Sequence, residues 1–509
     1  MNRAIKNPDV RVPGTRWMKH SGLIVYFLLL AICTSCSRAE EPAVLEEKLP
    51  NIVVILADDM GLGDIGVYSS GSKVPTPHLD SLAASGIRFA DAHSPSSVCT
   101  PTRYGLLTGR YAWRTHMKKG VLKGYSPLLI DTDRSTLPSM LREKGYATAA
   151  IGKWHLGLGD SEVTDYSKPL HPGPNAVGFD YFFGIPASLD MPPYTFVEDD
   201  RVYTSFDGET IGDSERRRDG GGGYWHAGPI ARDFSHESVL PEFAQHSAAW
   251  IREQAADAGK PFFLYVPLSA PHTPWMPTPE FIGRSEVGYY GDFVTQVDHT
   301  VGHILSALEE TGVARNTLVV FATDNGARWS PEEIAKWGYR ANLHFRGQKA
   351  DIHEGGHRVP MIVSWPGRVS SGTESTYLTS LIDLYATIAD VVGIEPGPED
   401  GVDSQTILPA LLGESDDRQG SVIHHSSRGM FAIRDGDWKL IEGLGSGGFT
   451  RPVIVEPEEG GPAGQLYNLA DDPSEKTNLY QERPDVVERL MRKLDEIRGS
   501  DHQTNQASL

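Results

Sequence analysis

Apolar runs that end in polar side chains recur along the chain. Four of them lie at residues 51–57, 146–151, 261–266 and 317–322, and the first is rich in β-branched residues. Unbroken apolar runs of this length are typical of strands buried on both faces of a mostly parallel sheet. Apolar residues at helical spacing predict helices between and after them, at residues 137–144, 241–258, 293–310 and 377–392. The alternation predicts an α/β sandwich around a central sheet.

The pattern changes near residue 412. Two stretches rich in Pro, Gly and polar residues, 396–401 and 413–420, mark a linker. Shorter runs beyond it predict strands within residues 421–434, 438–442 and 465–468, and a helix over residues 484–498. We therefore expect a catalytic domain over residues 49–412 and a C-terminal subdomain over residues 421–509.

The N-terminus carries an apolar run at residues 22–33 that follows basic residues and is too short for a comfortable membrane span. It predicts a signal peptide over residues 1–39 with cleavage after Ala39, and hence export to the periplasm or the extracellular space. Met18 as the true start and Cys36 as a lipoprotein attachment site are the open alternatives.

Composition narrows the function classes. The 509 residues suffice for one large domain and a smaller one, and 39% hydrophobic and 22% charged residues are ordinary for a globular enzyme. A formal net charge of -20 argues against a nucleic-acid partner and against adsorption to anionic membranes. An anionic substrate must therefore be captured by a local cluster of positive groups.

Cysteine usage singles out one residue. Of the three cysteines, Cys33 and Cys36 lie in or beside the signal, which leaves Cys99 as a thiol without a disulfide framework. The pattern Cys99-x-Pro101-x-Arg103 predicts a helix entrance, where free N–H groups favour an anion, with Arg103 one turn along. A small buried cysteine beside a helix cap is the alternative interpretation.

Acidic and amide side chains follow two of the predicted strands. Asp58 and Asp59 come directly after the first strand, and Asp324 and Asn325 follow a later one. Sites in open α/β sheets lie at the carboxyl ends of the strands. Adjacent acids repel each other unless a cation holds them, so these oxygens predict a hard metal ion, with a solvated loop or helix cap as the alternative for Asp58 and Asp59.

The segment around Cys99, extended by Thr108-Gly109-Arg110, resembles the active-site signature of the type I sulfatases. Further matches in the family's order are Asp58-Asp59, Gly152-Lys153-Trp154-His155, Pro271-His272, Asp324-Asn325-Gly326, and Gly347-x-Lys349 with Glu354-Gly355-Gly356. The resemblance implies an alkaline-phosphatase-like α/β sandwich with a small C-terminal antiparallel sheet and a helix. It also implies oxidation of Cys99 to formylglycine by a formylglycine-generating enzyme.

The resemblance further implies roles for individual residues. One divalent cation, expected to be calcium with magnesium as the alternative, would be held by Asp58, Asp59, Cys99, Asp324 and Asn325. Sulfate binding and proton transfer would fall to Arg103, Lys153, His155, His272 and Lys349.

The implied activity is hydrolysis of sulfate esters, and the motifs are most similar to the arylsulfatase and N-acetylgalactosamine-6-sulfatase branch, which points to a sulfated glycan or a small sulfate ester as substrate. A phosphonate or phosphate ester hydrolase of the same superfamily is one alternative. An inactive sugar-binding surface protein with unmodified Cys99 is the other.

Loops over a rigid scaffold usually set substrate choice. Candidates for lining a sugar pocket are Trp113, Arg114, His116, Tyr194, Trp225, His226 and Trp329. We expect Arg428 and the His424–His425 pair on the exposed surface, with the pocket rim as the alternative.

Overall fold

The computed structural model describes residues 48–213, 224–257, 259–415, 418 and 420–500. Residues from Leu49 onward form one compact unit. The predicted signal peptide over residues 1–39, with Cys36 and the alternative start Met18, lies outside the described residues. No helix in the described part of the chain is both long and apolar enough to cross a membrane.

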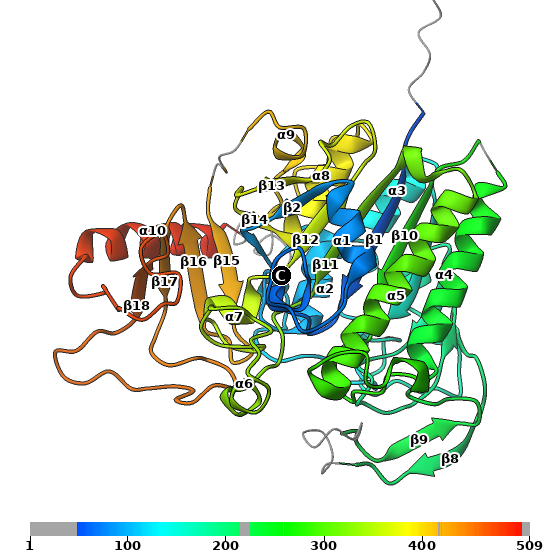
Figure 1. Ribbon diagram of the computed structural model, residues 1–509, viewed down its shortest axis with the longest axis horizontal. Coiled ribbons are helices and arrows are strands. Elements are labelled where there is room, and N and C mark those ends of the chain that lie inside the picture. The colour runs from blue at the N-terminus through cyan, green and yellow to red at the C-terminus, as the bar shows by residue number, and fades with distance from the viewer. Residues whose placement is uncertain (1–47, 214–223, 258, 416–417, 419, 501–509) are drawn as a thin grey trace, which may run out of the picture. The chain divides into compact units, whose positions relative to one another are not determined.

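A ten-stranded sheet lies at the centre of the unit (Figure 1). Its strands, in spatial order, are β13 (Thr373–Ser375), β2 (Ile87–Phe89), β12 (Met361–Ser364), β11 (Thr317–Thr323), β1 (Asn51–Ala57), β10 (Phe262–Pro267), β4 (Ala147–Lys153), β5 (Tyr181–Ile185), β6 (Val197–Glu198) and β7 (Arg201–Val202). The central strands β11, β1, β10, β4 and β5 run parallel, and β12, β6 and β7 are antiparallel to their neighbours. The predicted mostly parallel sheet is confirmed, and the carboxyl ends of its central strands meet at one edge.

Helices cover both faces of this sheet. Successive side chains of β1 point to opposite faces, and on each face they belong to a separate hydrophobic core. Val53 and Ile55 belong to one core, and Val54 and Leu56 to the other. The first core also contains side chains of α1 (Pro77–Ala84), α4 (Val239–Ala255) and α5 (Gly288–Glu310). The second contains side chains of α2 (Cys99–Thr108), α3 (Leu137–Glu143), α8 (Leu384–Val391) and α9 (Leu408–Leu411). The expected α/β sandwich is therefore confirmed, with helices on both faces of the central sheet.

One predicted helix is shorter than the pattern indicates. Residues 377–392 were expected to be helical throughout, but α8 begins at Leu384. Before it, β14 (Thr379–Ser380) pairs with β3 (Ala92–His93), and the Ser380 N–H donates to the Asp383 carboxylate at 2.8 Å. Strand pairing and this local cap compete with the helix and delay its start. The remaining β-strands and α-helices of the described residues are β8 (Phe206–Thr210), β9 (Gly228–Ala231), α6 (Pro331–Trp337) and α7 (Glu354–His357).

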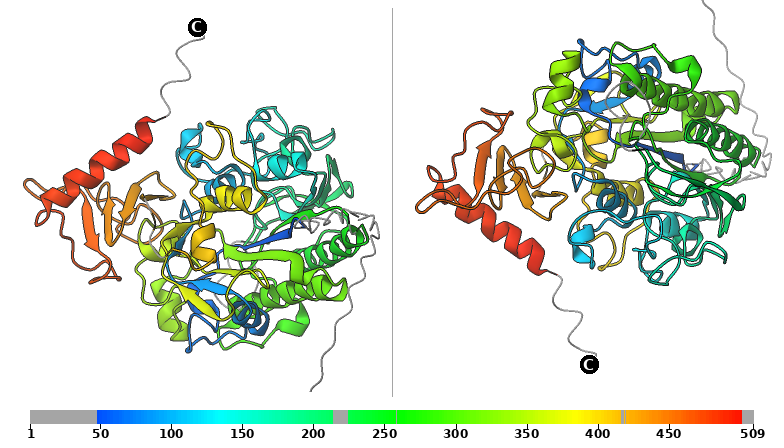
Figure 2. Two further views of the ribbon diagram at one scale, coloured as in Figure 1. Left: turned by 90° about the horizontal axis from the view of Figure 1, so that it is seen from above. Right: turned by 90° about the horizontal axis from the view of Figure 1, so that it is seen from below.

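The C-terminal part forms a second, smaller sheet. Strands β15 (Val422–His425), β16 (Phe431–Asp435), β17 (Trp438–Ile441) and β18 (Gln465–Asn468) pair antiparallel in that order. Helix α10 (Pro484–Gly499) lies along this sheet (Figure 2) and buries Val486, Leu490 and Leu494 against it. The expected antiparallel sheet with one packed helix is confirmed.

The smaller sheet is joined to the larger one by buried polar side chains. His424 and His425 are buried, which corrects our expectation of an exposed surface. They are covered because β15 lies against the loop before Cys99: the His425 carbonyl accepts hydrogen bonds from the Ser97 N–H at 3.0 Å and the Ser96 hydroxyl at 2.9 Å. A strand of the small sheet therefore helps to position the loop that leads to Cys99.

Lys439 of β17 is the central cation of this junction. Its Nζ lies 3.0 Å from Glu354 Oε1 and 2.8 Å from Glu475 Oε1, and it donates to His357 Nε2 at 2.9 Å. The side chains of Lys439 and both glutamates are fully buried. Removing one partner of a buried ion pair leaves the other charge without compensation, which costs more than the intact pair contributes.

We predict that Lys439→Met lowers the free energy of unfolding by about 3–5 kcal/mol, because Glu354 and Glu475 lose their shared cation in a buried environment. Urea denaturation followed by intrinsic fluorescence measures the change. The matched control is Lys168→Met, which breaks a pair of the same 2.8 Å length with Asp165 in an exposed position and should leave the midpoint unchanged. Equal midpoints for the two variants would contradict the prediction.

Candidate active site

Cys99 is the first residue of α2 and is 1% exposed. Its Sγ lies 3.5 Å from Asp58 Oδ1 and 3.5 Å from Lys349 Nζ. Burial and the nearby Asp324 carboxylate raise the pKa of the Cys99 thiol far above its usual value. An unmodified Cys99 would therefore stay protonated and would be a poor nucleophile, since the thiolate is the reactive form.

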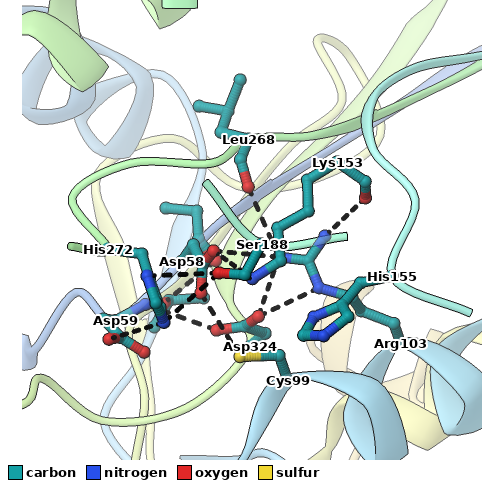
Figure 3. Close-up of polar contacts among 12 residues, drawn as sticks. Asp58, Asp59, Cys99, Arg103, Lys153, His155, Ser188, Leu268, His272 and Asp324 are labelled. Atoms are coloured by element: carbon teal, nitrogen blue, oxygen red, sulfur yellow. Dashed lines mark hydrogen bonds and ion pairs between the residues drawn. The ribbon is translucent and has the colours of Figure 1, made fainter. Parts of the chain in front are cut away.

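The carboxyl ends of four parallel strands carry charged and polar side chains into one cluster around Cys99 (Figure 3). Asp58 and Asp59 follow β1, and Asp324 and Asn325 follow β11. Lys153 ends β4, with His155 two residues on, and His272 lies in the loop after β10. Arg103 reaches the cluster from α2, and Lys349 from the loop before α7.

Three carboxylates and three cationic side chains form ion pairs in this cluster. Lys153 Nζ lies 2.5 Å from Asp58 Oδ2, and Lys349 Nζ lies 2.6 Å from Asp59 Oδ1. The third pair is formed by Arg103, whose Nη2 lies 2.8 Å from an oxygen of Asp324. The charges of these six side chains balance, so a divalent cation would make the site net positive and suited to an anionic ester.

Arg103 takes a position that the sequence pattern did not indicate. Its guanidinium is fully buried and donates to Asp324 at 2.8 and 3.1 Å, to the Lys153 carbonyl at 2.9 Å and to the Leu268 carbonyl at 3.4 Å. Although burial opposes the charge, the Asp324 and Asp58 carboxylates keep the pKa of Arg103 above its ordinary value. The geometry makes Arg103 a support for Asp324 and for the ends of two strands.

The carboxylates differ in their electrostatic surroundings. Burial opposes ionisation of Asp58, but Lys153, His272 and Arg103 outweigh it and hold the pKa of this carboxyl well below its usual range. Burial and the neighbouring Asp58 charge raise the pKa of Asp324 to about 6. Crowded carboxylates of this kind are stabilised by a bound cation.

The donor set fits a hard metal ion. Ligand atoms of Asp58, Asp59, Cys99 and His272 all lie within 4.8 Å of one another. Asn325 Nδ2 donates to Asp59 Oδ1 at 2.8 Å, whereas its Oδ1 is buried and has no hydrogen-bond partner. A buried amide oxygen without a donor, next to carboxylates, is the kind of oxygen ligand that Ca²⁺ or Mg²⁺ takes.

Two histidines offer different proton chemistry. His155 Nε2 lies 2.9 Å from the Leu122 carbonyl, which makes it the donor, and leaves Nδ1 as a buried acceptor without a partner. Burial, followed by the Lys153 and Arg103 charges, holds the pKa of His155 well below its usual value. His272 Nδ1 lies 2.6 Å from the Thr273 carbonyl, and its Nε2 lies 3.8 Å from Asp59 Oδ2. His155 is thus a neutral imidazole whose Nδ1 can accept a proton.

Ser188 was missed by the sequence analysis because it lies in no recognisable motif. Its hydroxyl lies 3.2 Å from both Lys153 Nζ and His272 Nδ1 (Figure 3), and so links the end of β4 to the loop after β10. It comes from the segment after β5, the next parallel strand. Only its place after a neighbouring strand could have indicated it.

A cavity of about 290 Å³ opens onto this cluster. Its lining residues are Val98, Cys99, Gly120, Val121, His155, Asp190, Met191, Tyr224, His272, Thr273, Arg328, Lys349, Ser427 and Phe449. Phe449 and Ser427 come from the C-terminal part, so both parts of the chain build the cavity. A larger cavity of about 630 Å³ lies at the amino ends of β4 and β5, and none of the side chains of the cluster around Cys99 lines it.

None of the seven candidates for a sugar pocket lines this cavity. Trp113 is buried against the small sheet, and Arg114 pairs with Asp403 at 2.5 Å. Tyr194 is buried as well, and its hydroxyl donates to the Asp190 carbonyl at 2.9 Å. The presence of aromatic and basic residues in predicted loops therefore did not identify the lining of the cavity, because local sequence carries no information on which loops converge.

Two models of known protein families match this chain. A family model described as Sulfatase matches residues 50–394, and one described as N-sulphoglucosamine sulphohydrolase, C-terminal, matches residues 347–500. This chain belongs to the sulfatase family. The family resemblance of the motifs is thereby confirmed, and the enzyme is a sulfuric ester hydrolase.

Several sulfatases are similar over most of their length. An N-acetylgalactosamine-6-O-sulfatase of Bacteroides thetaiotaomicron is 34% identical over 505 residues, covering 92% of this chain and 97% of the relative. Human arylsulfatase A is 34% identical over 451 residues, covering 84% of this chain and 83% of the relative. A solved structure from a Bacteroides thetaiotaomicron core genetic locus for the metabolism of multiple glycosaminoglycans has a TM-score of 0.79 at 32% identity, covering 89% of this chain and 99% of that chain.

Proposed function

We propose that this sulfatase is an exported enzyme that removes sulfate from a sulfated glycan, with formylglycine at position 99 as its nucleophile and Ca²⁺ as its metal ion. The observation that carries the proposal is the setting of Cys99: a buried thiol at a helix N-terminus, 3.5 Å from both Asp58 and Lys349, in the lining of a cavity. Burial raises the pKa of this thiol and so disfavours the reactive thiolate, whereas a hydrated aldehyde at the same place would carry two hydroxyl groups. Its formation requires a formylglycine-generating enzyme as a maturation partner.

The first half of the reaction transfers the sulfuryl group. One hydroxyl oxygen of the hydrated aldehyde attacks the sulfur and loses its proton to a neighbouring carboxylate, for which Asp58 and Asp324 are both in place. The bond between sulfur and the sugar oxygen breaks as the new bond forms. His272 lines the cavity and delivers a proton from Nε2 to the departing oxygen, so that a neutral alcohol leaves.

The second half releases sulfate. His155 Nδ1, the buried nitrogen without a partner, takes the proton of the second hydroxyl group. The carbon–oxygen bond to the sulfate group then breaks, inorganic sulfate leaves, and the aldehyde forms again and is rehydrated by water. A serine or cysteine at this place would have no second hydroxyl, so its sulfated form would be a dead end.

The cationic side chains hold the ester during both halves. Lys349 lines the cavity and lies beside residue 99, where its ammonium group can bind sulfate oxygens as their negative charge shifts. Although burial opposes the charge, Asp59 keeps the pKa of Lys349 above its ordinary value, so that it stays cationic. Arg103, which does not line the cavity, acts as a positioning residue for Asp324.

The metal ion would be held by oxygens of Asp58, Asp59, Asp324 and Asn325 and by an oxygen of the modified residue 99. Bound there, it would supply positive charge for the sulfate oxygens and lower the pKa of the attacking hydroxyl group. Carboxylate and amide oxygens from two strand ends form the flexible set that suits Ca²⁺.

A sulfated carbohydrate is the substrate class that the relatives support. Curated relatives include N-acetylgalactosamine-6-sulfatases, and a protein solved in complex with a neocarrahexaose has a TM-score of 0.69 at 25% identity. A cavity of about 290 Å³ is of the size that accepts one sugar ring with its sulfate group.

The test is a sulfate-release assay on natively exported protein with N-acetylgalactosamine 6-sulfate, other sulfated sugars and an aryl sulfate. We expect free sulfate from at least one sulfated sugar, with kcat/KM above that for the matching phosphate ester and phosphonate. A preference for the phosphorus esters would replace this proposal with the phosphonate or phosphate hydrolase alternative. Binding of the sugars without release, by protein with an unmodified thiol, would favour the sugar-binding alternative.

A further inference from the structure

Arg328 is a cation of the cavity that the proposed chemistry does not use. It lies three residues after Asn325, beyond the end of β11, and lines the same cavity as Cys99 and Lys349. Its guanidinium lies over the ring of Phe449, with Cζ 5.0 Å from the ring centroid. Among the described residues no carboxylate comes within ion-pair distance of it, and no hydrogen bond to its side chain is formed. The other cations at the site are all paired with carboxylates.

The backbone around Arg328 is rigidly held. The Ala327 carbonyl accepts from Asn342 Nδ2 at 2.9 Å and from the Lys349 N–H at 3.1 Å, and the Trp329 indole donates to the Tyr339 carbonyl at 2.8 Å. Phe449 is fixed in turn, because its N–H donates to Asp351 Oδ1 at 2.7 Å. The backbone that carries the cation is therefore anchored on both sides, and the guanidinium has the Phe449 ring beside it before a ligand arrives, which lowers the cost of ordering it on binding.

The position of Arg328 is costly without a ligand. Burial lowers the pKa of Arg328, and the nearest compensating carboxylates, first Asp59 and then Glu333 and Asp190, lie beyond contact distance. A partly buried guanidinium without a carboxylate partner loses hydration without a compensating ion pair. An anionic group that entered the cavity would supply that partner, and Arg forms two parallel hydrogen bonds to a carboxylate or sulfate.

We propose that Arg328 is a specificity-determining residue that binds a second anionic group of the substrate, one other than the sulfate ester that is cleaved. The inference rests on the proposed function and extends it to the substrate class: a sugar with two anionic groups. The scissile sulfate already has Lys349 and the metal ion. A second oxyanion would be repelled by the Asp190 carboxylate in the lining of this cavity and by the protein's overall charge of -20. Its binding therefore requires a cation of its own.

The shared chemistry is an oxyanion, which can be a second sulfate on the same ring or the carboxylate of an adjoining uronic acid. Four substrates separate these sources: a monosulfated N-acetylhexosamine, the same sugar with a second sulfate, the same monosulfated sugar linked to a uronic acid, and an aryl sulfate. The holoenzyme is assayed on each, as wild type and as Arg328→Gln and Arg328→Lys.

We expect wild type to prefer one of the two dianionic substrates over the monosulfated sugar by roughly 10- to 100-fold in kcat/KM, the range of a charge-assisted hydrogen-bonded pair. Arg328→Gln should remove this preference, mainly through KM, and leave the rates on the monosulfated sugar and the aryl sulfate unchanged. Arg328→Lys should restore part of the preference, because it keeps the charge and loses the paired geometry.

Two outcomes would overturn the inference alone: wild type without a preference for either dianionic substrate, or Arg328→Gln lowering kcat/KM equally on all four. The second would show that Arg328 binds the scissile sulfate or supports the fold, and thermal melting of the variant tells these apart. A wild-type enzyme that released sulfate from none of the four would instead overturn the proposed function, and the inference with it.

Discussion

Replacing Cys99 with alanine is expected to lower the rate of sulfate release by roughly 10⁴-fold or more, the scale seen when a covalent nucleophile is removed. The physical reason is the position of the side chain in the lining of the cavity, 3.5 Å from Asp58 and from Lys349, where alanine leaves no atom that can attack the sulfur. Cys99→Ser should be equally inactive in turnover. Its single hydroxyl can accept the sulfuryl group once, but no second hydroxyl remains to expel it.

Mass spectrometry of the residue-99 peptide distinguishes these states. Wild type should show an aldehyde in place of the thiol, and Cys99→Ser should accumulate a serine heavier by one SO₃ group after incubation with substrate. Thr102→Ser is the matched control on the same helix, since it keeps the hydroxyl that donates to the Ser96 carbonyl at 3.0 Å. Full activity in protein whose residue 99 is an unmodified thiol would disprove the proposed nucleophile.

Removing the metal ion should abolish turnover and lower the Tm. In addition to burial, the buried carboxylates of Asp58 and Asp59 both raise the pKa of Asp324 by their charge, and Asn325 Oδ1 has no hydrogen-bond partner there. A ligand that binds only the folded state at 100 times its Kd adds about 2.7 kcal/mol of stability. We therefore expect protein treated with a chelator to be inactive and to melt earlier, and Ca²⁺ to restore both properties at a lower concentration than Mg²⁺.

Two neighbouring carboxyl groups provide the control for this experiment. Asp59→Asn should shift the Ca²⁺ titration to higher concentrations, because Asp59 belongs to the cluster. Asp64 is buried close by in sequence, but its carboxyl accepts hydrogen bonds from the Tyr290 and Tyr339 hydroxyls at 2.6 and 2.7 Å and lies outside the cluster. Asp64→Asn should therefore keep the wild-type titration. Identical titrations for the two variants would argue against a metal ion at this site.

The candidate site was predictable to the extent that its residues follow buried strands. Asp58 and Asp59, and likewise Asp324 and Asn325, come directly after apolar runs, and parallel strands deliver such residues to one edge of a sheet. Arg103 was predictable as a neighbour of Cys99 but not as the partner of Asp324. The helix period places it one turn from Cys99, whereas the Asp324 contact depends on how α2 packs across the sheet.

The sequence by itself determined the alternation of strands and helices, the small antiparallel sheet and the family, because these depend on local periodicity and on motifs of fixed spacing. Only the tertiary structure decided the lining of the cavity and the burial of His424 and His425. Arg328 and Phe449 lie far apart in the chain, and nothing local to either indicates that the guanidinium of one lies over the ring of the other. Contacts between distant segments follow from how layers pack, and that information is spread over the whole core.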